Sequence, residues 1–521
     1  MESQVTESAV FPSQSYSSSF FTKFPTDSRF LQVTHQSFEP VRVIDGKDIE
    51  FNLNRYSAGN VIMIQDTTLN VRIKIVKADG VSLPNIAKFV APRNNILHTL
   101  FSSVTLTINN TCLTTSPENY CYKAFITNML SYSASAKSTH LQLQGYSDDN
   151  PGNFDSANPL VNFGFAQRNN LFRKDYKSTN GYRPDGAQFC GRLYHELTSC
   201  ETGLPPNTKV RLVLTKNLDS FILQSDETDE EQYKVKITSI DLTVPIAQLS
   251  QNVFDELSYL MSKKEDVRPV TIQYRRIEIR PISIPKDKVD FQSGDLFPDA
   301  DLPCRIVIGF VDARARIGNY YKNPYYFRRK WTYKKPNSPP LHDSLEQRVA
   351  LVEEIIKTLT TPHNETNAGI EPQASSSAAS SSASVEKRVS EELQRRLRQI
   401  FPRQPQPQAE EEDAVFEDEE TTVYIKKIDL KINSSPIDQI DDKQTEDECL
   451  NSYFRLCQTT GVLNSPYTNG ISYYDFRNGQ FLSCYDLSTS SKCGTNYVIP
   501  TVRSGHLRIR LLFYFFQKDK L

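Results

Sequence analysis

The sequence lacks several features on which motor proteins, membrane proteins and secreted proteins depend. No GxxxxGKS or GxxxxGKT phosphate loop occurs in its 521 residues, which argues against ATP-driven work. No apolar run approaches the roughly 18 residues of a membrane span. The start, Met1 to Phe21, has no apolar core of a secretion signal, so we predict that no signal peptide exports the protein.

Cysteine and histidine are not arranged as catalytic or metal sites require. The nine cysteines include no CxxC pair, and without a secretion signal we expect reduced thiols packed as small hydrophobes. The seven histidines form no HxH or HExxH pattern, which argues against a cupin-like metal oxygenase. Cys190 lies near His195, but a buried thiol and a strand-edge imidazole are favoured over a nucleophile and its base. We predict no catalytic residue, no metal ligand and no cofactor.

Charge and composition favour a β protein without a strong electrostatic partner. The formal net charge of −2 gives no overall attraction to nucleic acid or to an acidic membrane. The chain has 25 Tyr and 29 Phe but only 4 Met and 1 Trp, and such aromatic residues suit the half-buried surface of a sheet. The acidic residues at 226–231 favour solvated loop charge over a glycosidase carboxylate pair.

Apolar and polar residues alternate in two successive series of predicted strands. The first series has strands at 49–53, 69–75, 104–108 and 210–214, with one amphipathic helix at 122–130 and long polar loops over 131–185. The second series has strands at 235–237, 272–284, 305–311, from 423, and a last central strand Leu507 to Phe516, with a helical patch at 253–261. Short strands with long polar loops are typical of jelly-roll sandwiches.

These patterns predict an all-β fold of two jelly-roll β-sandwiches in tandem. We expect a flexible arm at 1–40, a first jelly roll at 41–222 and a second at 223–521. An alternative for the arm is that its aromatic residues order on a neighbouring subunit. A partly helical, partly disordered insertion is predicted at 329–420, with helices near 345–359 and 389–400.

A motif in the second half resembles that of a known family. Residues 302–312, Gly318 and 323–327 are similar to the pattern P-x-R-hydrophobic-G-hydrophobic-hydrophobic … G … N-P-F-x-F of the hexon-like major capsid proteins of Polinton/Maverick elements and adintoviruses. That family shares its fold with virophage and adenovirus-lineage double jelly-roll capsid proteins. The chain departs from the pattern at Tyr325, where Phe is usual, and it ends soon after Phe516, where relatives often run on.

Further segments follow the family in the same order. Residues 469–476, 478–481 and 485–487 resemble its G-I-x-x-x-D-F-x-x-G … F-D-L-T region, and a softer likeness covers parts of 191–212. The family-motif structural residues are Pro303, Arg305, Gly309, Asp312, Gly318, Asn323, Pro324, Phe327, Gly470, Asp475, Phe476, Gly479, Asp486 and Gly505.

The motif residues also have a plain physical meaning. Asn323 before Pro324 predicts a turn, because the residue before proline leaves the α region and Asn can bond to its own backbone. Gly309 inside an apolar strand predicts a bulge or a close backbone approach.

The resemblance implies a structural major capsid protein and no enzyme. Three chains would form a trimer with a pseudo-hexagonal footprint that tiles an icosahedral shell. The expected location is the virion capsid, assembled in the host nucleus or cytoplasm, with penton and minor capsid proteins as partners. The loops at 131–185 and the insertion are candidates for trimer contacts and an outward tower.

Two other functions remain open from the residues alone: a β-sandwich carbohydrate- or protein-binding surface module, and a β-rich enzyme. The basic and aromatic residues at 328–335 favour an anchor of the insertion, pairing with the acidic residues at 410–420, over direct nucleic-acid binding.

Overall fold

The strand order of the first half identifies its architecture. The computed structural model describes residues 29–334 and 420–517, with breaks at 42–46, 55–59, 81–89, 115–117, 174–184, 201–202, 226–232, 263–271, 273, 275, 286–287, 299–300, 434, 437–448 and 489–503. Eight main strands form the first sandwich: β1 (Phe30–Phe38), β2 (Asp48–Asn52), β4 (Thr68–Lys77), β6 (Phe101–Ile108), β7 (Thr111–Cys112), β8 (Ala187–Arg192), β9 (Val210–Lys216) and β11 (Tyr233–Leu249). Short strands β3 (Asn60–Ile62), β5 (Val90–Pro92) and β10 (Leu223–Ser225) accompany them.

The eight strands pair as one long hairpin that has been rolled up. One sheet has the order β1-β11-β4-β8 and the other the order β2-β9-β6-β7. The first strand therefore pairs with the eighth, the second with the seventh, the third with the sixth and the fourth with the fifth, all antiparallel. This nested order in two sheets is that of a jelly roll.

Alternating side chains explain why these segments form strands of a sandwich. In β4, Leu69, Val71 and Ile73 are almost fully buried, whereas the residues between them are half-exposed. A period of two places every second side chain on the inner face of the sheet. The inner residues of both sheets join one hydrophobic core.

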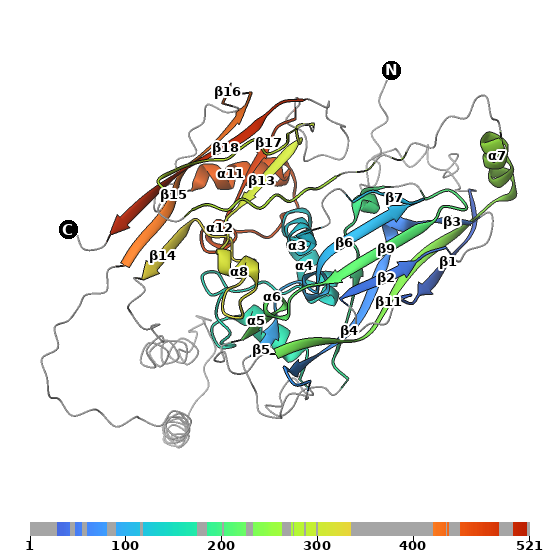
Figure 1. Cartoon of the computed structure of the whole chain (residues 1–521), viewed down its shortest axis with the longest axis horizontal. Coiled ribbons are helices and arrows are strands. Elements are labelled where there is room, and N and C mark those ends of the chain that lie inside the picture. Colours follow the sequence, from blue (N-terminus) through green and yellow to red (C-terminus); the bar gives the residue numbers. More distant parts are fainter. Residues whose placement is uncertain are drawn as a thin grey trace, which may run out of the picture. The chain divides into compact units, whose positions relative to one another are not determined.

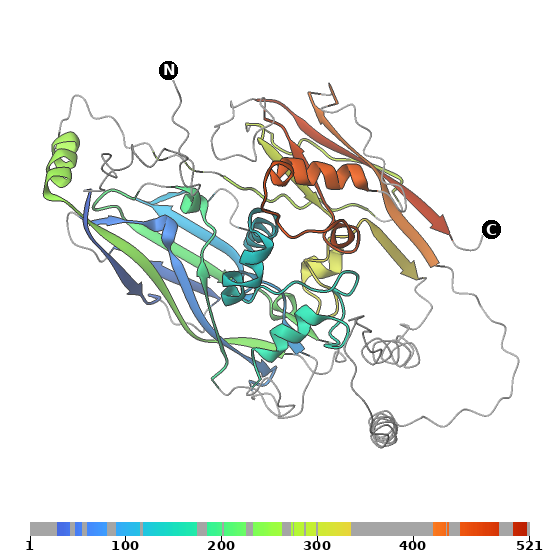
Figure 2. The same ribbon diagram turned by 180° about the vertical axis from the view of Figure 1, so that it is seen from behind.

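A second sandwich repeats part of this order. Its strands are β12 (Asp290–Gln292), β13 (Arg305–Gly309), β14 (Lys330–Lys334), β15 (Glu420–Ile432), β16 (Ser435–Pro436), β17 (Leu482–Asp486) and β18 (Leu507–Gln517). One sheet has the order β12-β18-β15-β14, with β16 also on β15, and the other has the order β13-β17. The blue and green strands of the first sandwich and the yellow to red strands of the second are seen in Figures 1 and 2.

Short helices connect the strands, and one of them belongs to both cores. The helices are α2 (Ile96–Thr99), α3 (Tyr120–Ser131), α4 (Ala134–Ser138), α5 (Phe163–Asn170), α6 (Asp219–Ile222), α7 (Gln251–Ser262), α8 (Ala313–Ile317), α11 (Leu450–Thr459) and α12 (Tyr473–Arg477), with 3-10 turns η1 (Ile64–Asp66), η2 (His140–Gln144), η3 (Glu196–Ser199) and η4 (Val462–Asn464). In α3, Tyr120 and Ala124 join the first core, whereas Phe125 and Met129 join the second. A helix that is apolar on several sides is expected to be buried, and α3 is buried between the two cores.

The predicted fold class, all-β with two tandem jelly rolls, is confirmed. The predicted helices at 122–130 and 253–261 correspond to α3 and α7, and the last strand is central because β18 lies between β12 and β15. No helix among the described residues is long and apolar enough to cross a membrane.

Several predicted details differ from the structure. The first sandwich extends beyond the predicted span 41–222, because β1 comes from the predicted arm and β11 from the predicted second domain. The edge strand β1 exposes Leu31 and Val33, which hid its role in the sequence pattern. The loops at 131–185 contain α4, η2 and α5, and the described part of 272–284 forms no strand. The helices predicted at 345–359 and 389–400 and the acidic residues at 410–420 lie outside the described residues.

Candidate functional site: the polar network between the two sandwiches

Charged side chains are buried where the loops of the first sandwich meet the second. Apart from the ends of β14, β15 and β18, both sandwiches belong to one compact unit. Arg168 in α5 is fully buried, and its Nη2 donates to Asp149 Oδ1 at 2.6 Å. Its other donors bind the backbone: Nε the carbonyl of Pro92 at 2.8 Å and Nη1 that of Ser147 at 2.7 Å. Each of the three guanidinium nitrogens thus has a partner, and these bonds hold together the loops from which the partners come.

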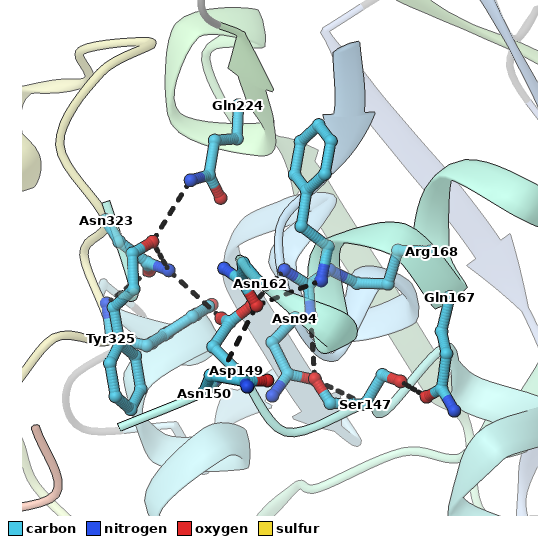
Figure 3. A network of polar contacts seen from close by, with 12 residues as sticks. Asn94, Ser147, Asp149, Asn150, Asn162, Gln167, Arg168, Gln224, Asn323 and Tyr325 are labelled. Carbon is cyan, nitrogen blue, oxygen red and sulfur yellow. Dashed lines mark hydrogen bonds and ion pairs between the residues drawn. The ribbon is translucent and has the colours of Figure 1, made fainter. Parts of the chain in front are cut away.

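Asn323 carries this network into the second half of the chain (Figure 3). Its side-chain amide donates to Asp149 Oδ2 at 3.2 Å and to the carbonyl of Phe154 at 2.9 Å. Its own Oδ1 accepts from the backbone N–H of Tyr325 at 3.0 Å, so the turn predicted at Asn323-Pro324 is confirmed. Gln224 donates to the same carbonyl of Phe154 at 3.0 Å.

A second carboxylate, that of Asp155, binds three groups of the 319–329 segment. Its Oδ1 accepts the backbone N–H of Asn323 at 2.7 Å, and its Oδ2 accepts Lys322 Nζ at 3.1 Å. Arg328 also binds Asp155, and its guanidinium lies 3.7 Å from the ring centroid of Tyr326. The basic residue Arg328 therefore binds the first half of the chain, whereas the sequence had suggested the acidic residues of the insertion as partners of its cluster.

Arg93 is buried beside this network without a full set of partners. Its Nη2 donates to the carbonyls of Asn319 at 2.6 Å and Tyr320 at 3.1 Å. Its Nε and Nη1 have no hydrogen-bond partner among the described residues. Burial lowers the pKa of Arg93 to about 10, against an opposing effect of Asp155 and Asp149.

Aromatic rings pack the same junction from the apolar side. Tyr325 stacks on Phe125 of α3 with ring centroids 4.1 Å apart, and its hydroxyl lies 2.7 Å from Thr99 Oγ1. Phe154 stacks on Tyr326 with ring centroids 4.8 Å apart. Tyr325 replaces the Phe that is usual in the family motif, and its hydroxyl gains a buried partner.

Three motif glycines of the second half touch the first half. A Cβ added to Gly479 would lie 2.3 Å from a ring carbon of Phe154, and one added to Gly470 would lie 2.9 Å from Ala134 Cβ. At Gly318 the added atom would lie 2.7 Å from Ser220 Oγ. These glycines permit a close approach that a side chain would prevent.

Other motif residues lie within the second sandwich. Gly309 meets Leu482 and Phe327, where an added Cβ would be 2.7 Å and 2.8 Å from their side chains, as the predicted close approach requires. Asp312 caps α8, and Asp475 forms a capping box with Ser472 at α12. The remaining motif residues lie as follows: Phe476 in the second core, Arg305 opposite Asp486 in the β13–β17 pair, Pro303 just before β13, Pro324 in the turn and Gly505 beside Leu302 and Asn433.

His195 is held as a structural residue. Its Nδ1 accepts from the N–H of Leu197 at 3.1 Å, and its Nε2 donates to the carbonyl of Ile64 at 3.2 Å. Burial lowers its pKa to about 4. Both ring nitrogens are thus occupied by backbone groups, which leaves no basic nitrogen for a nucleophile such as Cys190. Among the described residues no three or more His, Cys, Asp or Glu side chains form a possible metal site.

The sequence did not predict the central network residues, Arg93, Asp149, Asp155 and Arg168. Only Arg93 carried a signal, because it directly follows the apolar residues 89–92. Arg168 and Asp149 come from α5 and a loop, and no helical or strand period in the sequence relates their positions.

Several solved structures of virus proteins are similar to this chain. A chain of the Sputnik virophage is 10% identical with a TM-score of 0.43, covering 99% of this chain and 87% of that one. The Faustovirus major capsid protein is 8% identical with a TM-score of 0.40, covering 95% and 92%. The mavirus major capsid protein is 11% identical with a TM-score of 0.33, covering 99% and 94%. The chain is similar in structure to viral major capsid proteins. The strand pairing described above identifies the jelly roll.

Sequence comparison finds a protein that is similar to about half of this chain. An uncharacterized protein of Caenorhabditis elegans is 24% identical over 287 residues, which are 54% of this chain. The match spans 62% of that protein, less than two thirds of its length. No family model matches the chain.

Proposed function

We propose that this protein is a structural major capsid protein whose trimers tile an icosahedral shell. The observation that carries the proposal is the recurrence of jelly-roll pairing in one chain: β2–β9, β4–β8 and β6–β7 in the first sandwich have the counterparts β12–β18, β13–β17 and β15–β16 in the second. The family motif found in the sequence supports the same reading. Three such chains contain six sandwiches, which suit a pseudo-hexagonal capsomer.

The buried network supports a load-carrying role for the junction. The ion pair Arg168–Asp149 is almost fully buried, and Asn323 links it to the second half. A tile in a shell must transmit force without changing the angle between its halves, and a buried, hydrogen-bonded network with close glycine contacts resists such bending.

Exposed apolar residues beside the junction are our candidates for the trimer contact. Leu218 and Ile317 expose 58% and 72% of their surface, and the touching pair Ser220–Gly318 brings their segments together. Exposed apolar residues contributed by two segments of a chain favour a protein interface. The 131–185 loops stay candidates for trimer contacts, because they expose Leu143 and Leu160, whereas Asp149 and Asp155 of the same loops bind within the chain.

Mass measurement and electron microscopy of the purified full chain test the proposal. We expect a trimer of about 180 kDa, three times the chain mass of 59.5 kDa, with threefold particles on a hexagonal base. The double variant Leu218→Asp with Ile317→Asp should shift the trimer to monomers. The control variant Leu31→Asp with Val41→Asp changes two equally exposed apolar residues, at 66% and 62%, and should leave the trimer intact. A stable wild-type monomer at micromolar concentration would contradict the proposal.

A further inference from the structure

The second sandwich lacks one position that the first sandwich fills. In the first, β4 lies between β8 and β11, and β11 joins it to β1. In the second, β13 takes the place of β4 and pairs with β17, but no described strand lies on its other side. The segment that precedes β12, as β1 precedes β2, is 272–284, whose described residues form no strand.

The backbone of β13 offers hydrogen-bonding groups on this side. The N–H of Leu487 donates to the carbonyl of Cys304 at 2.8 Å, so even-numbered residues of β13 face β17. Because alternate residues of a strand direct their polar groups to opposite sides, Arg305, Val307 and Gly309 direct theirs away from β17. An exposed strand edge of this kind is a template for another strand.

The side chains of β13 are also less covered than those of its counterpart. Leu69, Val71 and Ile73 of β4 are 0%, 1% and 0% exposed. The residues 305–308 are all half-buried, and Gly309 is exposed. Arg305 Nε is buried without a hydrogen-bond partner among the described residues. Among the described residues, no strand gives this edge the hydrogen bonds and the apolar cover that β11 gives to β4.

We propose that the N-terminal arm of a second copy of this chain fills the position beside β13 as an added strand. The segment 13–24 has the right chemistry, because it lies between Pro12 and Pro25, contains no Gly or Pro, carries one charge at Lys23 and includes four aromatic residues. Aromatic residues suit a pleated surface, and a segment with a single charge near its end can enter a mostly apolar slot. The insertion 329–420 is richer in charge and proline.

The donor is a second copy because the tether to the chain's own β1 is short. Phe24 and Phe30 are six residue steps apart in the chain, so their Cα atoms are at most about 22 Å from each other. Phe30 pairs with Leu249, the last residue of β11, whereas Tyr320, which follows β13 in the chain, donates to the carbonyl of Tyr233, the first residue of β11. These two ends of β11 are about 50 Å apart along the strand. In a threefold assembly each copy can give its arm to the next, so that every slot is filled. The inference rests on the proposed self-assembly and names a contact within it.

Cross-linking between two tagged full-length chains tests the exchange. One chain carries Phe20→Cys or Phe21→Cys, because neighbouring side chains of a strand face opposite ways, and the other carries Val307→Cys. Both carry Cys112→Ser to remove an exposed thiol, and chains without introduced cysteines serve as the blank. With a short bismaleimide we expect a product that bears both tags, and an excess of a peptide of residues 13–24 should suppress it.

The matched control moves the acceptor cysteine to β4. Arg72→Cys lies on the counterpart strand, which is paired on both sides, and it should give no product above the blank. The proposal is overturned if no product bears both tags, or if a chain with both cysteines cross-links only within itself. Trimers without the cross-link would overturn this inference alone, whereas a cross-link in dimers that never form trimers would overturn the capsomer and retain the exchange.

Discussion

The two sandwiches follow the same pairing order but differ in completeness. In the first, β4 pairs with β8 on one edge and with β11, a strand of 17 residues, on the other. In the second, β13 has five residues and pairs with β17 alone among the described strands. The same strand order therefore gives β4 a partner on each edge, whereas β13 has a described partner on one edge only.

This difference teaches that local strand patterns do not decide whether a sheet is finished. The burial of the side chains shows the difference. The inner residues of β4 are excluded from solvent, whereas those of β13 are half-exposed. The two halves also contribute differently to the junction between them. Both of its central carboxylates, Asp149 and Asp155, come from the first half. We expect the first sandwich and its loops to be the rigid frame on which the second is held.

Removing one partner of the buried ion pair should have the largest effect. Asp149→Ala leaves Arg168 buried and uncompensated and also removes an acceptor of Asn323, so we expect a loss of about 3–5 kcal/mol in the free energy of unfolding. Chemical denaturation measures it. Arg211→Ala, which breaks the exposed pair with Glu50, is the control and should change little. Equal effects of the two variants would refute the structural role of the network.

Core truncations in equivalent strands compare the two halves directly. Leu69→Ala in β4 should cost about 2–5 kcal/mol, because the site is fully buried and the cavity cannot collapse. Ile306→Ala in β13 should cost clearly less in the isolated chain, because that residue is half-exposed. The same denaturation experiment decides between them, and a larger loss at Ile306 would mean that β13 is already covered.

Acid should weaken the first sandwich more than the second. Burial lowers the pKa of His98 and of His195 from 6.5 to about 4 in the folded chain. The unfolded chain therefore binds more protons between these values, and stability falls as the pH drops from 6.5 towards 4. Between pH 7 and pH 5 each histidine should contribute about 2 kcal/mol to the loss. Denaturation at both pH values should show a smaller loss in His195→Gln, and an unchanged loss would count against the burial of His195.

Hydrogen exchange should show the smallest but most local difference. The amide of Val307 faces the open edge of β13 and should exchange much faster in the isolated chain than that of Ile306, which faces β17. In β4 the amides of adjacent residues should be protected alike, because both edges are paired. If the amide of Val307 becomes protected only on assembly, a strand of another copy covers this edge of β13. If it is protected in monomers, the edge is already paired within the chain, and the difference between β13 and β4 disappears.

Alternation and amphipathic spacing predicted much of the fold. The period of two at 69–75 became β4, and the helical spacing at 122–130 became α3. The sequence failed where packing overrides pattern: β1 exposes its apolar residues at a sheet edge, and β11 was assigned to the wrong half because chain order does not reveal its pairing partners. The residues that hold the junction, such as Asp149 and Asn323, are far apart in the chain. A contact of this kind leaves no local pattern in the sequence from which it could be predicted.

Electron microscopy of the purified full-length chain tests the central claim most directly. If two fused jelly rolls form the repeating tile of a shell, the particles should be trimers with threefold symmetry and a hexagonal outline formed by six sandwiches. Monomeric particles, or a closed dimer with no threefold axis, would contradict that account.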